Sequence, residues 1–457
     1  MRERGEIPML ERIFQLKKHN ATVHTEVVAG LTTFLAMAYI LAVNPSILGT
    51  VMDANGVFVA TAVASAIATF IMGFVANYPI ALSAGLGLNA YFAYTVCMGE
   101  LGGAPDAFKI ALTAVLVEGV IFILMSLFKF RERIVNGIPQ NLKLGITCGI
   151  GLFVAFIGLV NAGVVKASSA TTVELGDLSS AAVVLSIAGF VVIASLSHYR
   201  VKGAVLIGIL VTWLLGMLAQ AAGWYQGPSV LPDFSGGLNL AAIKNTAFKF
   251  DFAWVAGHAV QFLAIVMSFL YVDLFDTIGT VVGVADKAGL LDENGNLPRV
   301  GKVFMADAVG TTIGACLGTS TVTSFVESSA GVAAGGRTGL SAVVTGILFL
   351  LALALSPVFL AIPSFATAPA LIYVGMLMLS SARQISFDGD VADTVGAYMA
   401  ILMMPLSYSI ATGIMFAIMT WVILKVLTGK VKDVSPIMWV VFGLFCLRIV
   451  TLITNFQ

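Results

Sequence analysis

The sequence predicts an all-α, polytopic membrane protein, with fourteen transmembrane helices arranged as two inverted repeats of seven. Three observations lead to this fold class. Hydrophobic residues make up 59% of the 457 residues and charged residues 11%, with a mean hydropathy of +1.00, whereas a soluble protein carries about 25% charged residues. Apolar runs of about 18 residues or more, the length of a transmembrane helix, recur along the chain. Lysine and arginine also gather in alternate connections between these runs.

The apolar runs define the expected spans in order. Residues 1–25 form a charged N-terminal segment that lacks the apolar stretch and cleavage site of a signal peptide. The first seven spans are expected at 26–48, 57–77, 79–96, 107–129, 138–163, 180–197 and 203–222. After a long loop, the second seven are expected at 256–285, 301–317, 319–334, 338–360, 367–384, 394–409 and 410–428. A last apolar segment, 437–454, contains Arg448 and is expected to be an interfacial helix or a fifteenth span.

The distribution of basic residues tests this order of spans. With the N-terminus in the cytoplasm, the cytoplasmic connections hold nineteen lysines and arginines and the opposite side four. Such an excess is typical of the cytoplasmic side, so both ends of the fourteen-span unit are expected inside a bacterial inner membrane. The nineteen are Arg2, Arg4, Arg12, Lys17, Lys18, Lys129, Arg131, Arg133, Lys143, Arg200, Lys202, Lys287, Arg299, Lys302, Arg337, Arg383, Lys425, Lys430 and Lys432, and the four are Lys109, Lys166, Lys244 and Lys249.

An odd number of spans in each half means that the two halves insert in opposite orientations, which is the inverted-repeat plan of secondary transporters. The third span of each half is also unusual. Residues 79–96 contain Gly85 and Gly87, and residues 319–334 begin with a Ser/Thr run that continues from Gly318. Such segments are poor helix formers, and interrupted spans at matching positions indicate a binding site at the membrane midplane. We therefore expect non-helical breaks in the third and tenth spans.

Four acids lie in the apolar segments of the second half. Asp273 and Asp276 are three residues apart and share a helix face, and Asp307 and Glu327 lie in the next two spans. Acids at membrane depth are rare and commonly functional. Because neighbouring carboxylates in a low dielectric cannot all ionise, at least one should carry a proton. The structural alternative is that single acids only bond hydroxyl or amide groups. Glu118, in the fourth span, fits either role.

The predicted cavity suits a flat, neutral ligand rich in hydrogen-bond donors. Carboxylates accept bonds from the amino groups of bases, and an aromatic side chain such as Phe325 provides a stacking surface. The second hypothesis is an anion carrier or channel on the same fold, because fold does not fix function. The acid Glu327 argues against it, since it would repel an inorganic anion. An enzyme is not expected, because the sequence offers no soluble domain and no catalytic constellation. The four scattered cysteines indicate neither a metal site nor disulfides, and no cofactor is expected.

Several other charged residues are expected to have ordinary roles. Glu26 lies at the entrance of the first span and is expected at the membrane interface. Asp388, Asp390 and Asp393 form a charge run in a loop and are expected to be solvated.

The motifs of the second half resemble those of the AzgA-like purine permeases, in the nucleobase–ascorbate (nucleobase:cation symporter type 2) family. The resemblance covers essentially the whole chain, apart from 437–454. It is carried by Asp276-Thr277-Ile278-Gly279-Thr280, Phe304-Met305-Ala306-Asp307-Ala308, Thr319–Gly331 and Ala84-Gly85-Leu86-Gly87-Leu88-Asn89-Ala90-Tyr91. It implies import of guanine, hypoxanthine or adenine with protons, by an elevator-like motion of a core domain against a gate domain. The core would be 26–129 and 256–360, and the gate 138–222 and 367–428. Nucleic acid is no partner, and a homodimer is left open.

The resemblance also implies roles for individual residues. The base would be held by Asp276 and Glu327, with recognition shaped by Phe325 and Asn89 and with Ser328 and Thr323 beside them. It also implies that Asp307, the ninth-span acid, is needed for activity. From the cluster of acids itself, we expect Asp273, Asp307 and Glu118 to serve proton coupling. Many relatives in the pyrimidine branch carry glutamate in the eighth span where this chain has aspartate. Which of Asp273 and Asp276 contacts the base is therefore left open.

Overall fold

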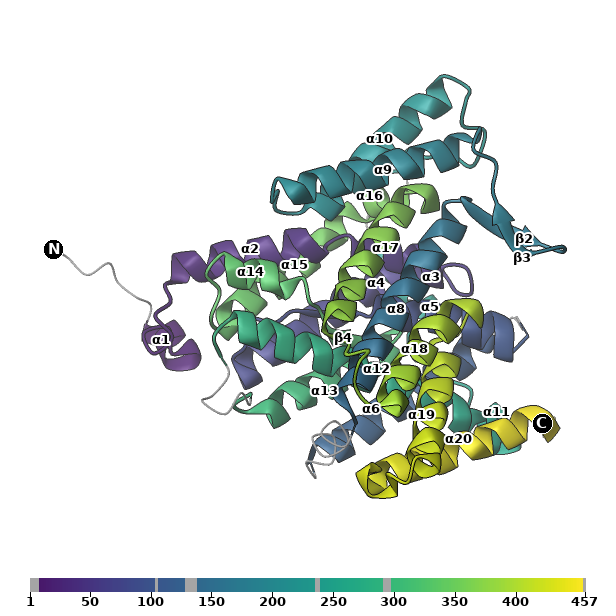
Figure 1. Cartoon of the computed structure of the whole chain (residues 1–457). Helices are drawn as coiled ribbons and strands as arrows, with labels where there is room; N and C mark the ends of the chain where they lie inside the picture. Colours follow the sequence, from purple (N-terminus) through teal and green to yellow (C-terminus); the bar gives the residue numbers. More distant parts are fainter. Residues whose placement is uncertain (1–7, 103–105, 128–137, 235–238, 291–296, 455–457) are drawn as a thin grey trace.

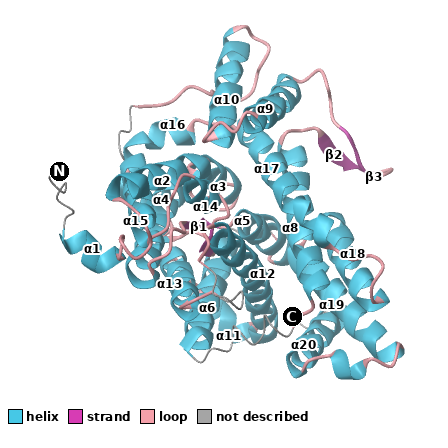
Figure 2. Cartoon of the chain, turned by 60° about the vertical axis from the view of Figure 1, so that its left-hand side comes forward, coloured by secondary structure: helices cyan, strands magenta, loops and turns pink. Residues whose placement is uncertain are grey.

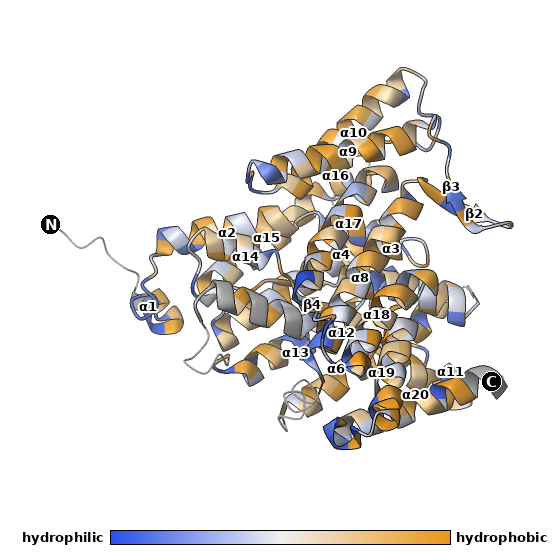
Figure 3. Ribbon diagram, in the orientation of Figure 1, coloured by the Kyte–Doolittle hydropathy of each residue, from blue (hydrophilic) through white to orange (hydrophobic). Residues whose placement is uncertain are grey.

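The computed structural model describes residues 8–102, 106–127, 138–234, 239–290 and 297–454 (Figure 1). Almost all regular structure is helical, and the helices are hydrophobic over most of their length (Figure 3). The first half contains α1 (Pro8–Phe14), α2 (Val23–Met37), α3 (Ile40–Leu48), α4 (Ala54–Ile71), α5 (Leu86–Ala90), α6 (Ala107–Leu127), α8 (Gln140–Asn161), α9 (Ala181–His198) and α10 (Ala204–Ala221). The second contains α11 (Phe252–Gly257), α12 (Ala259–Lys287), α13 (Val300–Leu317), α14 (Ser328–Ala333), α15 (Gly339–Ala352), α16 (Ser356–Leu360), α17 (Ser364–Leu379), α18 (Val391–Leu406), α19 (Ile410–Leu427) and α20 (Pro436–Thr454).

The fourteen predicted spans all correspond to segments of this structure, within a few residues at each end. Among the described residues, ten helical stretches are long and apolar enough to cross a membrane, and shorter apolar helices occupy 259–274 and 391–406. The first span is divided into α2 and α3, with Tyr39 between them. Lys129, Arg131 and Arg133, which were assigned to the cytoplasmic side, lie outside the described residues. The prediction of an all-α polytopic fold is confirmed.

The third and tenth spans are interrupted by strands, as predicted. Strand β1 (Leu82–Ala84) precedes α5, and β4 (Val322–Ser324) precedes α14. The strands are antiparallel, with Ser83 opposite Thr323, and they lie in the middle of the helices (Figure 2). Unpaired backbone groups are not tolerated at membrane depth. Here each broken span supplies the hydrogen-bond partners of the other, and the Thr69 hydroxyl in α4 bonds the backbone of Leu82 on its free edge.

The helices fall into two sets by their contacts. In one set, α13 packs against α4 and α6, and α15 packs against α2 and α4. In the other, α8 packs against α17 and α18, α9 packs against α10 and α17, and α18 packs against α19. Helix α12 contacts both sets, through α6 on one side and through α8 and α19 on the other. A hairpin of β2 (Val165–Ser168) and β3 (Thr172–Leu175) follows α8.

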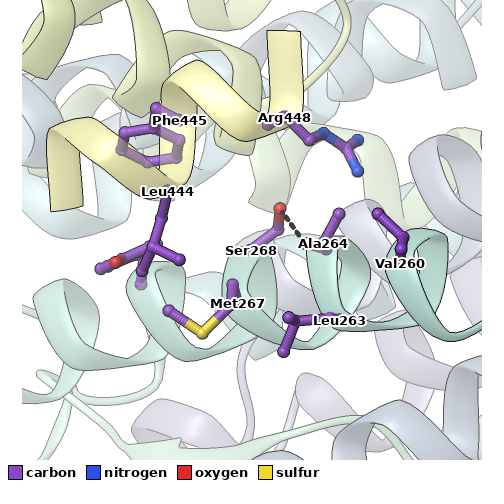
Figure 4. Close-up of a pocket in the computed structure, with 9 residues that line it drawn as sticks. Val260, Leu263, Ala264, Met267, Ser268, Leu444, Phe445 and Arg448 are labelled. Carbon is purple, nitrogen blue, oxygen red and sulfur yellow. Dashed lines mark hydrogen bonds between the residues drawn. The ribbon is translucent and has the colours of Figure 1, made fainter. Parts of the chain in front are cut away.

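The C-terminal segment forms α20, which packs against α19 and α12. Phe445 contacts the Tyr271 ring at a centroid distance of 5.2 Å. Apolar side chains of α12 and α20 line a shallow groove, with Arg448 at one end (Figure 4). The Arg448 guanidinium forms a 2.6 Å ion pair with Glu100, at the end of the third span. The segment is thus a helix that is fixed to the third and eighth spans as well as to its sequence neighbour.

Two of the three loop acids, Asp390 and Asp393, are paired with a buried lysine and are not solvated as expected, whereas Asp388 is exposed as expected. Asp390 accepts a 2.6 Å bond from Lys425, whose residue is only 4% exposed, and it also caps the start of α18. Asp393 lies 3.2 Å from the same ammonium and accepts a bond from the Trp421 indole. The expectation was wrong because a lysine buried at the end of α19 requires anionic partners.

Glu26 also departs from the expectation, since it is fully buried rather than interfacial. Its carboxylate accepts backbone N–H bonds from Arg337, Thr338 and Ser341. These groups precede or begin α15, where helix N–H groups have no partner within the helix. Glu26 therefore joins the first span to the eleventh as a helix cap.

Candidate functional site

The crossing of β1 and β4 places the third and tenth spans in contact. Two backbone bonds extend the pairing beyond the strands, from Phe325 N to Ala81 O and from Gly85 N to Thr321 O. The Ser328 hydroxyl accepts a 3.0 Å bond from the Ala81 amide. Ser328, which was predicted beside the base, therefore also connects α14 to the residue before β1. The chain leaves each strand into a short helix, so α5 and α14 begin at opposite ends of the pair.

Glu327 lies immediately before α14 and is held by a tyrosine from the first span. The Tyr39 hydroxyl donates a 2.5 Å hydrogen bond to Glu327 Oε1. Tyr39 is fully buried at the junction of α2 and α3. Sequence reasoning missed this residue. Its only signal was a tyrosine in the middle of an apolar span, which is too common to identify a site without knowing what it faces.

Asp276 lies against Gly85 at the junction of β1 and α5. A Cβ atom at Gly85 would be 3.5 Å from Asp276 Oδ2 and 2.8 Å from the Thr323 methyl group. The Asp276 carboxylate therefore lies within contact distance of the start of α5, where the gap between Gly85 and Thr323 is too small for a methyl group. Asp276 also interacts electrostatically with Asp307 and Glu327, so the acids from three predicted spans do come together.

Asp273 has different surroundings, although it lies on the same helix. Its Oδ1 atom is 3.0 Å from the hydroxyl of Thr277, one turn later. The same hydroxyl is 3.0 Å from Asp307 Oδ2 and 2.9 Å from the Thr323 hydroxyl. All four side chains are buried. Thr277 is therefore the meeting point of α12, α13 and β4, and sequence reasoning did not identify it.

Two predicted residues contact the segment that leads into β4. The Asn89 amide oxygen accepts a hydrogen bond from the Ser320 hydroxyl. Glu118, on α6, accepts a 2.8 Å bond from the Thr321 hydroxyl. Glu327 follows the other end of β4, so Glu118 and Glu327 belong to opposite ends of the strand. Glu118 therefore contacts the chain next to β4, but it makes none of the hydrogen bonds described for Thr277.

The arrangement offers hydrogen-bond acceptors to a ligand. Carboxylates from α12 and from the start of α14 lie at the crossing, and the Phe325 ring lies on the chain between β4 and Glu327, where it is 5% exposed. The nearest cation in sequence, Arg337, bonds the carbonyl groups of Val332 and Gly336 instead. Neighbouring acids in a low dielectric disfavour each other's ionised form. The carboxylate oxygens of this arrangement can accept hydrogen bonds from a ligand.

Comparisons with known proteins agree with a transporter. Residues 24–420 match the sequence model of a family described as "Permease family", of the xanthine/uracil permease type. A putative permease of Methanocaldococcus jannaschii is 45% identical, over 97% of this chain and 98% of its own length. The adenine permease AdeP of Escherichia coli is 42% identical, over 97% and 96%. The guanine/hypoxanthine permease PbuG of Bacillus subtilis is 43% identical, over 97% and 100%.

Among solved structures, the transmembrane domain of the cyanobacterial bicarbonate transporter BicA has the same fold. The TM-score is 0.66, and the match covers 87% of this chain and 97% of that domain. The two sequences are only 13% identical. This likeness concerns the fold alone, because one fold carries many functions.

Proposed function

Because this chain belongs to the permease family that its sequence matches, the nucleobase–ascorbate transporters, we propose that it imports purine nucleobases together with protons across a bacterial inner membrane. Relatives of similar length are named for adenine and for guanine and hypoxanthine. Their names support purines as the substrate class, and both groups of purines belong in the test.

The observation that carries the proposal is the convergence of Asp276 and Glu327 at the strand crossing. The two carboxylates come from different elements and are close enough to interact electrostatically. A purine base presents several N–H donors in one plane, and carboxylates accept such bonds in pairs. In the proposed complex, Asp276 and Glu327 accept bonds from the base and Phe325 stacks on its face. Asn89, Thr323 and Ser328 shape recognition.

Asp276 rather than Asp273 is the proposed base contact. Asp276 is only partly buried and lies beside the start of α5, whereas Asp273 is fully buried and bonded to Thr277. Asp273 and Asp307 are instead proposed to carry the coupling proton, with Glu118 as a further acid of the same core. The sequence left open which of the two aspartates contacts the base, and this assignment is our proposal for that choice.

The proposed motion is a displacement of a core domain against a gate domain. The two sets of helices described above support this division, since α13 packs against α4 and α6, and α8 packs against α17 and α18. The core would contain 26–129 and 256–360, and the gate 138–222 and 367–428. Since the acids and the strand crossing belong to the core, such a motion carries the whole binding site.

The test uses the purified full chain in liposomes. Uptake of labelled hypoxanthine, guanine and adenine is measured with and without an inward proton gradient, and again with a protonophore. Asp276→Asn and Glu327→Gln should each abolish uptake. Asp388→Asn is the matched control, because Asp388 is an exposed loop acid. If uptake persists in both site variants with its pH dependence unchanged, the proposal that Asp276 and Glu327 bind the base is wrong. Uptake of none of the bases by the natural chain would overturn the function.

An anion carrier is the second candidate, because the fold is shared with a bicarbonate transporter. The acids at the crossing argue against it, since an anion there would meet like charges in a low dielectric. The same liposomes decide the question: bicarbonate, chloride and sulfate fluxes should stay at the level of empty liposomes.

A further inference from the structure

Thr277 is surrounded by more oxygen atoms than its one proton can serve. Its hydroxyl oxygen lies within 3.2 Å of Asp273 Oδ1, both carboxyl oxygens of Asp307, and the Thr323 hydroxyl. A hydroxyl group has one donor and two acceptor positions. Thr277 can therefore donate to only one of the two aspartates, whatever other partners these acids have.

This limit determines how many protons Asp273 and Asp307 can carry if every contact of Thr277 is to be a hydrogen bond. If both aspartates were ionised, one would face a Thr277 lone pair without a proton between them. With one proton on the pair, the protonated aspartate donates to Thr277, Thr277 donates to the ionised aspartate, and Thr323 donates to Thr277. With two protons, Thr277 either still donates to the carbonyl oxygen of one carboxylic acid, or it accepts from both acids and donates to Thr323 instead. The contacts of Thr277 with both aspartates and with Thr323 can all be hydrogen bonds when the aspartate pair carries one or two protons. They cannot all be hydrogen bonds when the pair carries none.

In the arrangement where both acids donate to Thr277, the second proton reverses the hydrogen bond between Thr277 and Thr323. In the one-proton arrangement, the Thr323 proton is used on Thr277. In this two-proton arrangement, Thr323 accepts from Thr277, and its own proton is released toward another acceptor. Thr323 lies on β4, and its methyl group faces Gly85 beside Asp276. The reversal therefore reaches the strand that leads to Phe325 and Glu327.

We infer that Thr277 is the positioning residue that couples protonation of the Asp273–Asp307 pair to base binding, by turning its hydroxyl between the acids of α12 and α13 and Thr323 of β4. The inference rests on the proposed function. One proton is taken up by the pair when the base binds, and the released Thr323 proton strengthens the site for a base with an acceptor atom. Since linkage is reciprocal, the proton and the base each raise the affinity of the other.

Other ionisable groups surround the cluster, so its effect must be separated from theirs. Asp276, on the same helix, interacts electrostatically with Asp307, and Glu327, just before α14, interacts with Asp276. From α6, Glu118 bonds Thr321. Strands β1 and β4 and helices α4, α5 and α11 carry no acid or base. The remaining packed helices contribute Lys143 of α8, Lys425 of α19 and Arg448 of α20, of which Lys425 and Arg448 are paired with acids elsewhere.

The experiment measures proton uptake on binding of hypoxanthine to the purified full chain. Calorimetry in buffers of different ionisation enthalpy gives the number of protons, and the dissociation constant is measured between pH 6 and 8. The natural chain should take up about one proton, and its dissociation constant should rise by up to tenfold per pH unit. Thr277→Val keeps the shape of the side chain but removes the hydroxyl. It should reduce proton uptake toward zero and hold the dissociation constant within about twofold over the same range.

Three further variants make the result specific. Thr277→Ser keeps a hydroxyl and should restore proton uptake, whereas Thr323→Val should lose it as Thr277→Val does. Thr312→Val is the control, because the Thr312 hydroxyl bonds only the Ala308 carbonyl of its own helix among the bonds described. Full proton uptake by a folded Thr277→Val would overturn the inference, and so would a natural chain that binds the base without a proton. A natural chain that binds no base would overturn the proposed function instead. If Thr277→Val fails to fold, the comparison of Thr323→Val with Thr312→Val decides.

Discussion

Replacing Tyr39 by phenylalanine tests how the first span prepares Glu327 for binding. The substitution keeps the buried ring and removes only the hydroxyl that donates to Glu327 Oε1 at 2.5 Å. A hydrogen bond to a charged group contributes about 1.5–3 kcal/mol, and about 1.4 kcal/mol corresponds to tenfold in affinity. If this bond fixes the carboxylate for the base, Tyr39→Phe should raise the dissociation constant of hypoxanthine about tenfold to a hundredfold.

The assay is equilibrium binding of labelled hypoxanthine to the purified chain, followed by uptake into liposomes. Tyr78→Phe is the matched control, because the buried Tyr78 also loses a 2.5 Å hydrogen bond, in its case to the Pro298 carbonyl. The control should bind hypoxanthine as the natural chain does. An affinity of Tyr39→Phe within twofold of the natural chain would refute the argument. Tighter binding would also refute it, because it would mean that Tyr39 competes with the base for Glu327.

Three further predictions follow from the site and its surroundings. Asp276→Asn should weaken base binding more than tenfold, whereas Asp273→Asn should bind the base within about threefold but lose the pH dependence of binding, as measured by titration at pH 6 and 8. Gly85→Ala should lower the stability by about 1–3 kcal/mol through overpacking, seen as a lower melting temperature in detergent, because its Cβ would lie 2.8 Å from a side chain of β4. Hydrogen bonds from Lys425 and then Lys430 hold the pKa of Asp390 below its usual range. A depressed pKa stabilises the fold above the unfolded value of about 3.9, so the higher melting temperature of the natural chain over Asp390→Asn should persist at pH 5 to 7 and shrink as the pH falls below about 4.

The sequence was informative about the spans because hydrophobicity is a local property. Each apolar run was long enough to be recognised alone, and the short, polar third and tenth spans indicated their own breaks through Gly85, Gly87 and the Ser/Thr run. The four acids stood out because charge is rare in such segments. Their individual roles could not be read in the same way. Asp273 and Asp276 are equivalent by spacing, and only their neighbours distinguish them.

The residues that sequence reasoning missed share one property. Tyr39 and Thr277 are ordinary residue types in helices, and their contacts span 288 residues and 46 residues of sequence, to Glu327 and Thr323. Glu26 and Asp390 were misplaced for the same reason, because a charge near a helix end is equally consistent with solvent and with a buried partner. No local pattern records a partner that lies in another span.

The amino-acid sequence by itself determined that this chain crosses the membrane many times, that its two halves correspond, and that acids are concentrated in the later half. These features depend on the transfer of side chains between water and lipid, which each segment expresses alone. Only the tertiary structure decided that β1 and β4 pair, that Tyr39 holds Glu327, and that Thr277 joins Asp273 to Asp307. Those features depend on hydrogen bonds between distant segments, whose geometry exists only after the helices have packed.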